Sequence, residues 1–147
     1  MKKTIWSIIS VAMIFSIYFS YEMGYFHFLW DADKSKISFG VVGLFVFGWS
    51  KLGYHLYKDS LNEKSLDTGY ELADHSMALG MLGTVVGFII MLGSLKGADL
   101  SPESIKALFS VALSGMGTSL YTTAVGLISA TILRAAYHSA YEEQQNV

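Results

Sequence analysis

The sequence predicts an all-α membrane protein with four transmembrane helices, the third and fourth long enough to extend into the cytoplasm or periplasm. Hydrophobic residues make up 52% of its 147 residues and charged residues only 15%, a balance too apolar for a soluble domain of this length. The mean hydropathy is +0.43. Four apolar stretches approach the ~20 residues that one bilayer crossing requires. We therefore interpret the whole chain, 1–147, as a single transmembrane domain.

The first apolar stretch is expected to cross the membrane over about residues 4–25. Lys2 and Lys3 precede it, which is also how a cleaved signal peptide begins. The stretch is longer than the apolar region of a signal peptide, and bulky aromatic residues stand where a small-residue cleavage site belongs. These residues are Tyr18, Phe19, Tyr21 and Tyr25. We therefore expect the segment to remain in the protein as its first span.

The remaining spans are predicted at about 37–57, 77–95 and 108–133. The second contains Lys51 and His55 in its last turns, and their polar ends must reach the membrane surface. The third and fourth spans contain no charged residue. Basic residues predict the orientation, since an N-terminus inside the cell gives the cytoplasmic segments six lysines and arginines and the outer loops four. Both termini and the short segment 58–76 are thus expected in the cytoplasm.

Capping patterns extend the last two helices beyond the bilayer. Thr68-Gly-Tyr-Glu71 reads as a capping box, which predicts that the third helix starts near Gly69. Ser101-Pro102-Glu103 offers a capping hydroxyl, a proline at the first helical position and an acid in the first turn, so the fourth helix is expected to start there. Good helix formers with a modest apolar stripe follow the fourth span and predict a cytoplasmic C-terminal helix over 134–147.

The third and fourth spans each carry one face of small residues. Those of the third span are Gly80, Gly83 and Gly87, with Thr84 beside them. Those of the fourth are Ser119, Thr123, Gly126 and Ala130, on an i, i+4, i+7, i+11 track. Such faces are typical of close helix packing, and also of helices that line a polar passage. The two threonines lie about 10 and 15 Å from the inner edges of their spans, at similar depth in the hydrocarbon.

Composition excludes several classes of function. The formal charge of −2 offers no basic surface for nucleic acid, and the absence of cysteine excludes disulfide frameworks and thiolate metal sites. The sequence contains no nucleophile–base pair, phosphate-binding loop or zinc motif. We therefore expect neither an enzyme nor a bound metal or cofactor.

Two acidic residues have alternative interpretations. Glu22 is either an acid that reaches the outer membrane surface or a partner for a polar group in an outer pore. Asp74, next to His75, is either part of a solvated helix turn or a group that gathers cations at the cytoplasmic end of the third span.

Two motifs resemble a known family. The segments GMLGTVVG (80–87) and SLYTTAVGLISA (119–130) are similar to motifs of the MotA, TolQ and ExbB proton-channel subunits, in the right order and on two spans. The resemblance covers 77–134. Four spans with a short first outer loop look more like the MotA branch, although 58–76 is too short for the cytoplasmic domain of flagellar stators. Thr118 stands where the ExbB branch has a glutamate.

The resemblance implies a stator-type subunit in the bacterial inner membrane. Five copies would surround two copies of a single-span partner whose intramembrane aspartate carries H⁺ or Na⁺. Residues along the ion pathway would be Thr84 and Thr123, opposite that aspartate, with Thr122 and Ser119. Helix packing would use Gly80, Gly83, Gly87, Gly126 and Ala130. The leading hypothesis is thus a channel-forming subunit that converts ion flow into mechanical work; the alternative is a non-conducting scaffold or anchor of a larger envelope complex.

Overall fold

The computed structural model describes residues 2–33, 35–96 and 101–145. Within these ranges all regular secondary structure is helical, without a β-strand, as the sequence predicted. The helices are α1 (Lys2–Glu22), α2 (Tyr25–Ala32), α3 (Ile37–Tyr57), α4 (Glu63–Leu95) and α5 (Pro102–Gln145).

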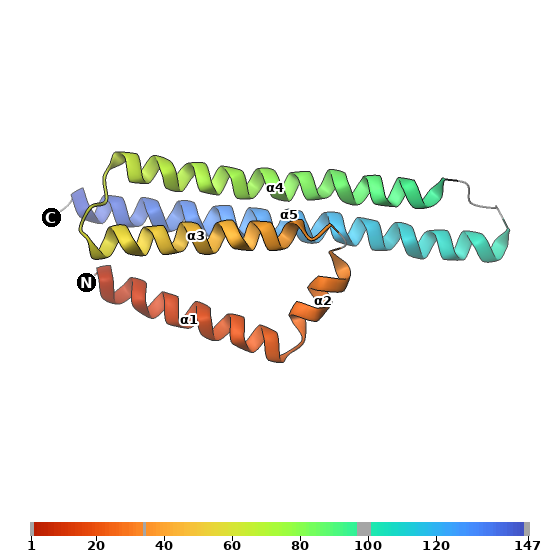
Figure 1. Cartoon of the computed structure of the whole chain (residues 1–147), viewed down its shortest axis with the longest axis horizontal. Helices are drawn as coiled ribbons and strands as arrows, with labels where there is room; N and C mark the ends of the chain where they lie inside the picture. Colours follow the sequence, from red (N-terminus) through yellow and green to blue (C-terminus); the bar gives the residue numbers. More distant parts are fainter. Residues whose placement is uncertain (1, 34, 97–100, 146–147) are drawn as a thin grey trace.

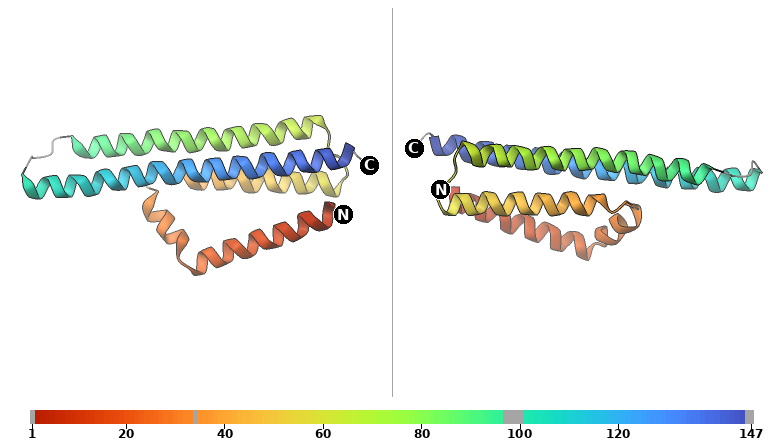
Figure 2. Two further views of the ribbon diagram at one scale, coloured as in Figure 1. Left: turned by 180° about the vertical axis from the view of Figure 1, so that it is seen from behind. Right: turned by 45° about the horizontal axis from the view of Figure 1, so that its top comes forward.

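Helices α4 and α5 form a long antiparallel hairpin that is the framework of the molecule (Figure 1). Helix α3 packs along both of them at the end where the chain termini lie (Figure 2). Helix α1 starts at the same end and diverges from the bundle, and α2 returns the chain to the start of α3 (Figure 1). The hairpin therefore carries most of the packing between elements.

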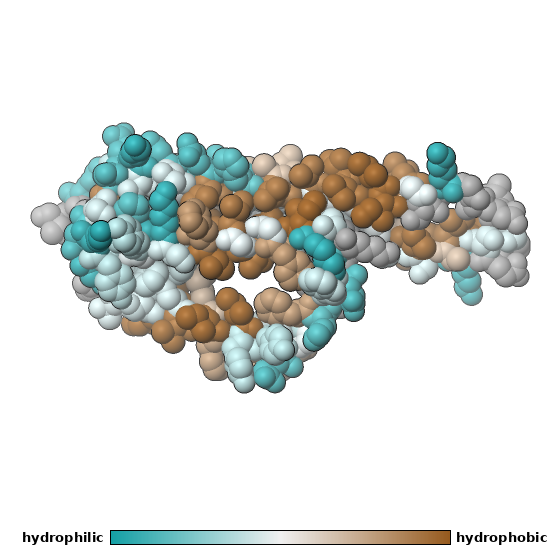
Figure 3. Space-filling model, in the orientation of Figure 1, coloured by the Kyte–Doolittle hydropathy of each residue, from teal (hydrophilic) through white to brown (hydrophobic). Residues whose placement is uncertain are grey.

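Three of the described helices are long and apolar enough to cross a membrane: Ile37–Tyr57, Glu63–Gly93 and Ser104–Glu143. Helix α1 contains a shorter apolar stretch, Trp6–Glu22. A band of hydrophobic residues covers the middle of the bundle, and polar residues gather at the end where the termini lie (Figure 3). This distribution fits a multi-pass membrane protein, and the fourth crossing stays a prediction.

The predicted first span, 4–25, is interrupted. Helix α1 ends at Glu22, and Gly24 takes a φ of +76°, a conformation that glycine adopts without strain. The chain then turns into α2, which occupies a stretch expected to be a loop. The end of the helix at Glu22 was not predicted from hydropathy, because the residues after it are also apolar and a single left-handed residue does not change the hydropathy.

The predicted start of the third helix near Gly69 is wrong. Helix α4 begins at Glu63, where Asn62 is the N-cap and its side chain accepts a hydrogen bond from Ser65 N at 2.9 Å. The Thr68 hydroxyl lies inside the helix and donates to Lys64 O at 2.9 Å. Most of the segment 58–76 is therefore helical.

The start of α5 agrees with its predicted cap. The Ser101 hydroxyl accepts a hydrogen bond from Ser104 N at 3.3 Å, and the helix begins at Pro102. From there α5 continues without interruption to Gln145, while 146–147 lie outside the described residues.

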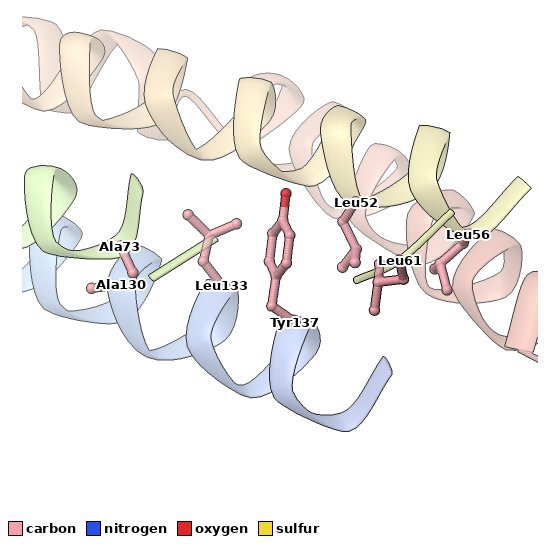
Figure 4. Packing of buried hydrophobic residues seen from close by; sticks show 7 residues of the cluster. All are labelled: Leu52, Leu56, Leu61, Ala73, Ala130, Leu133 and Tyr137. Atoms are coloured by element: carbon pink, nitrogen blue, oxygen red, sulfur yellow. The ribbon is translucent and has the colours of Figure 1, made fainter. Parts of the chain in front are cut away.

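A hydrophobic cluster joins α3, α4 and α5 at the end where the termini lie (Figure 4). Tyr137 is fully buried in it, and its hydroxyl donates to Gly48 O at 3.0 Å. A Cβ atom at Gly69 would lie only 2.4 Å from Tyr137 Cγ, so the tyrosine ring requires glycine there. The cluster residues are Leu52, Leu56, Leu61, Ala73, Ala130, Leu133 and Tyr137.

The buried carboxylate of Asp33 organises the turn between α2 and α3. One oxygen accepts hydrogen bonds from Ser35 N at 3.0 Å and Lys36 N at 3.1 Å, and the other from Ser38 N at 2.9 Å. Burial opposes ionisation, but the hydrogen bonds from Ser35 and Ser38 outweigh it and lower the pKa of Asp33 from its ordinary value of 3.8.

We expect the free energy of unfolding to depend on ionised Asp33. Because its pKa is lower in the folded chain, the contribution is complete above the unfolded value of 3.8 and is lost as the pH falls below it. Asp33→Asn should lower the free energy of unfolding by about 1–3 kcal/mol at neutral pH. Denaturant unfolding in detergent between pH 3 and 7 measures this, with exposed Asp31→Asn as the control. Equal stability of the two variants would contradict the prediction.

Candidate functional site

The α4–α5 hairpin is held together by contact between backbones. A Cβ atom at Gly126 would lie 2.9 Å from Gly80 Cα, and one at Gly80 would lie 3.0 Å from Gly126 Cα. Only glycine permits such an approach, which is how small residues associate helices in membranes. The two predicted packing glycines thus face one another.

Two further glycines receive side chains from the opposite helix. Thr122, 0% exposed, lies over Gly83, and Ser119, 3% exposed, lies over Gly87. The Ser119 hydroxyl lies 3.1 Å from Thr84 O, which ties the two helices at this level. In the single chain, Ser119 and Thr122 therefore face the α4–α5 seam, the surface along which the two helices meet. Ala130 is also buried, within the hydrophobic cluster.

Thr84 and Thr123 meet at the edge of this seam. Both are half-buried, and their hydroxyls are hydrogen-bonded to one another across the two helices. The Thr123 hydroxyl also lies 3.0 Å from Ser119 O in its own helix. The structure therefore brings together the two threonines that the sequence singled out.

These threonines belong to a line of polar pairs on one flank of the hairpin. Each member directly follows a buried seam residue, and one residue turns an α-helix by about 100°, so all members of a helix share one side. The α4 residues contact the α5 residues across the seam, so both sets lie on the same flank of the hairpin. The pairs, here called the polar ladder, are Tyr70–His138, Asp74–Arg134 and Thr84–Thr123.

Large apolar side chains surround the threonine pair on this flank. They too directly follow buried seam residues, and they are exposed in the single chain: Leu120 by 70% and Met81 by 60%. The others are Phe88, Met116 and Leu127. The hydroxyls of Thr84 and Thr123 thus interrupt an otherwise apolar surface.

The acidic candidates lie in different surroundings. Asp74 forms an ion pair with Arg134, and both side chains are about half exposed. Sequence reasoning missed this pair, although both residues follow buried positions of the same seam. Glu22 ends α1 at the point where that helix is far from the hairpin (Figure 1). The side chain of Thr118 lies outside the described residues.

Comparison with known proteins identifies the family. The model of the MotA/TolQ/ExbB proton channel family matches residues 58–147, which include all of α4 and α5. The chain belongs to the MotA/TolQ/ExbB proton channel family. No curated protein and no solved structure matches it.

Membership of the MotA/TolQ/ExbB family confirms the resemblance and places the polar ladder inside the matched region. Members are channel- and transport-associated membrane proteins that work in oligomeric complexes with other membrane proteins, and they are not known enzymes. An ion-driven, motor-type function follows for this chain at that level of detail.

We expect α4–α5 packing to be sensitive to added methyl groups only where the helices touch. Gly83→Ala and Gly87→Ala would place Cβ atoms 2.4 Å from Thr122 Oγ1 and 2.2 Å from Ser119 Oγ, and should lower the free energy of unfolding by about 1–3 kcal/mol. Gly93→Ala and Gly117→Ala are matched controls in open space on the same helices. Unfolding by SDS, followed by circular dichroism, measures the difference. Comparable stability in all four variants would refute the close approach.

Proposed function

We propose that this chain is the channel-forming subunit of a membrane motor driven by ion-motive force. It conducts H⁺ or Na⁺ together with a single-span partner that carries an intramembrane aspartate, and the ion flow becomes mechanical work. The observation that carries the proposal is the Thr84–Thr123 pair, the polar interruption of an apolar flank within the region matched by the family.

The chemistry of the flank explains why a partner is required. The segments 77–95 and 108–133 contain no charged residue, and threonine hydroxyls donate and accept hydrogen bonds without changing charge. A carboxylate supplied by another chain changes charge on protonation. The neutral form passes the apolar surface, and the charged form is held at the hydroxyls. Each elementary charge that crosses gains about 2.3 kcal/mol per 100 mV.

The exposed flank supports an assembly around this partner. Leu120 and Leu127 are 70% and 48% exposed in the single chain, so an adjoining chain or lipid must cover them. We propose that five copies turn this flank toward two copies of the partner. The complex lies in the bacterial inner membrane, with both termini and the charged end of the polar ladder in the cytoplasm.

Removal of the threonine hydroxyls tests the proposal. Thr84→Val and Thr123→Val should each reduce ion-coupled activity by about ten- to a hundredfold, because a hydrogen bond to a charged group contributes about 1.5–3 kcal/mol. Copurification of the partner should persist. Thr68→Val is the control, since that hydroxyl bonds only Lys64 O on the opposite face of α4. The readout is proton or sodium influx in cells that express both chains.

The scaffold hypothesis predicts the reverse pattern. Bulky substitutions at Gly83, Gly87 or Gly126 would break assembly, while Thr84→Val and Thr123→Val would behave like the Thr68→Val control. That outcome would overturn the motor proposal.

A further inference from the structure

The polar ladder continues beyond the threonine pair toward the end where the termini lie. Asp74 and Arg134 form an ion pair there, and the Tyr70 hydroxyl lies 3.1 Å from His138 Nδ1. His138 Nε2 lies 3.2 Å from a carboxylate oxygen of Glu142. With Ala135, four ladder residues line an open cavity of about 540 Å³. A connected polar opening therefore lies on the same flank as Thr84 and Thr123.

The opening is within reach of the threonine pair. Arg134 lies eleven residues beyond Thr123 in the same helix, about 16 Å along its axis. Thr131, exposed and next to buried Ala130, stands between them on this flank. A short row of water molecules from the threonines to Arg134 would pass the exposed apolar side chain of Leu127 and then the Thr131 hydroxyl.

We propose that Tyr70, Asp74, Arg134, His138 and Glu142 form the cytoplasmic exit of the channel and that the exiting ion is a proton. This inference rests on the proposed function and adds the route of release. His138 accepts a proton at Nδ1 from the Tyr70 hydroxyl, which regains one from water in the opening. His138 releases the Nε2 proton to Glu142, which passes it to bulk water. This leaves His138 as the Nδ1–H tautomer, and exchange with water in the opening moves the proton back to Nε2 before the next transfer.

The chemistry of this chain favours a proton over a metal cation. Imidazole has one nitrogen that accepts and one that donates, so it passes a proton through but does not bind sodium. The carboxylates of Asp74 and Glu142 are already paired with Arg134 and His138. The facing ionisable groups are Tyr70 and Asp74 of α4 and Arg134 and Glu142 of α5.

Asp74 has a separate task at this exit. Without it, every copy would present an uncompensated guanidinium to the leaving proton, and like charge at a narrow opening repels cations. The ion pair keeps the opening close to neutral. Arg134 in turn fixes the Asp74 carboxylate, which would otherwise hold the proton.

The charge of the exit is tested by a double-mutant series. Asp74→Asn should lower proton influx by about tenfold, and adding Arg134→Gln to it should restore at least half of the influx. Asp59→Asn is the matched control, because Asp59 forms its ion pair with Lys3, away from α4 and α5. Influx is read from a pH-sensitive fluorescent protein in cells that express the chain with its copurifying partner. No loss in Asp74→Asn, or no recovery in the double variant, would overturn the role of the pair.

The role of His138 is tested against another histidine. His138→Gln keeps a hydrogen-bonding side chain but cannot pass a proton, and it should lower influx by about tenfold. His75→Gln is the control, since His75 is turned about 100° away from Asp74 on α4 and its ring bonds Glu71 O of its own helix. Equal influx in the two variants would refute the relay.

The absence of cysteine from the chain allows a second measurement that leaves the five exit residues unchanged. In Thr131→Cys, a membrane-impermeant cationic thiol reagent applied from the cytoplasm should block influx. In Ile128→Cys it should not, because Ile128 lines a separate cavity between α5 and helices α1 and α3. Equal effects on both would contradict an open exit.

Thr84→Val in the same assay separates the two proposals. If it stops influx while the Asp74 and His138 variants match their controls, the exit proposal fails and the channel function stands. If none of these variants changes influx, the proposed function itself fails.

Discussion

Contact between Gly80 and Gly126 is the constraint on which the rest of the hairpin depends. It fixes the register of α4 against α5, and with this register Thr122 and Ser119 fit over Gly83 and Gly87. The same register brings Thr84 beside Thr123 and Asp74 beside Arg134, although each pair is far apart in sequence. A shift of either helix by one turn would separate all of these pairs together, so packing and site cannot vary independently.

The seam also divides the hydroxyl residues into two groups. Ser119 and Thr122 are buried in it and tie the helices together, whereas Thr84 and Thr123 lie one residue further round and reach its edge. Small residues on these helices were compatible with packing or with a polar passage. The buried hydroxyl residues fit the packing explanation, and the two threonines at the edge fit the polar passage. The two groups are about 100° apart around each helix. The residues of the proposed ion pathway are therefore not the ones that pack the two helices together.

Much of this arrangement follows from local sequence signals, and the rest depends on contacts between helices. The start of α5 was predictable because Ser101 and Pro102 act within a single turn. The start of α4 was not, because asparagine and threonine both cap helices, and it is Asn62 that accepts the capping hydrogen bond while Thr68 lies inside the helix. The spacing of the glycines indicated which face of each helix would be in contact. The Asp74–Arg134 pair could not be predicted in this way, because it depends on the register between two antiparallel helices. The α2 turn depended on the single φ angle of Gly24.

The distribution of rigidity along the hairpin bears on how such a subunit would perform work. At the end where the termini lie, Tyr137 and Leu133 lock α5 to α3 and α4, and further along the hairpin the glycine contacts hold α4 on α5. Neither contact leaves room for the helices to slide without steric overlap. In the proposed motor, the moving element must therefore be the partner, or the hairpin as one body. A fixed wall with hydroxyls at one depth gives the partner's carboxyl group a defined place to lose or gain its proton, and that requirement explains why the side chains around the threonine pair are apolar.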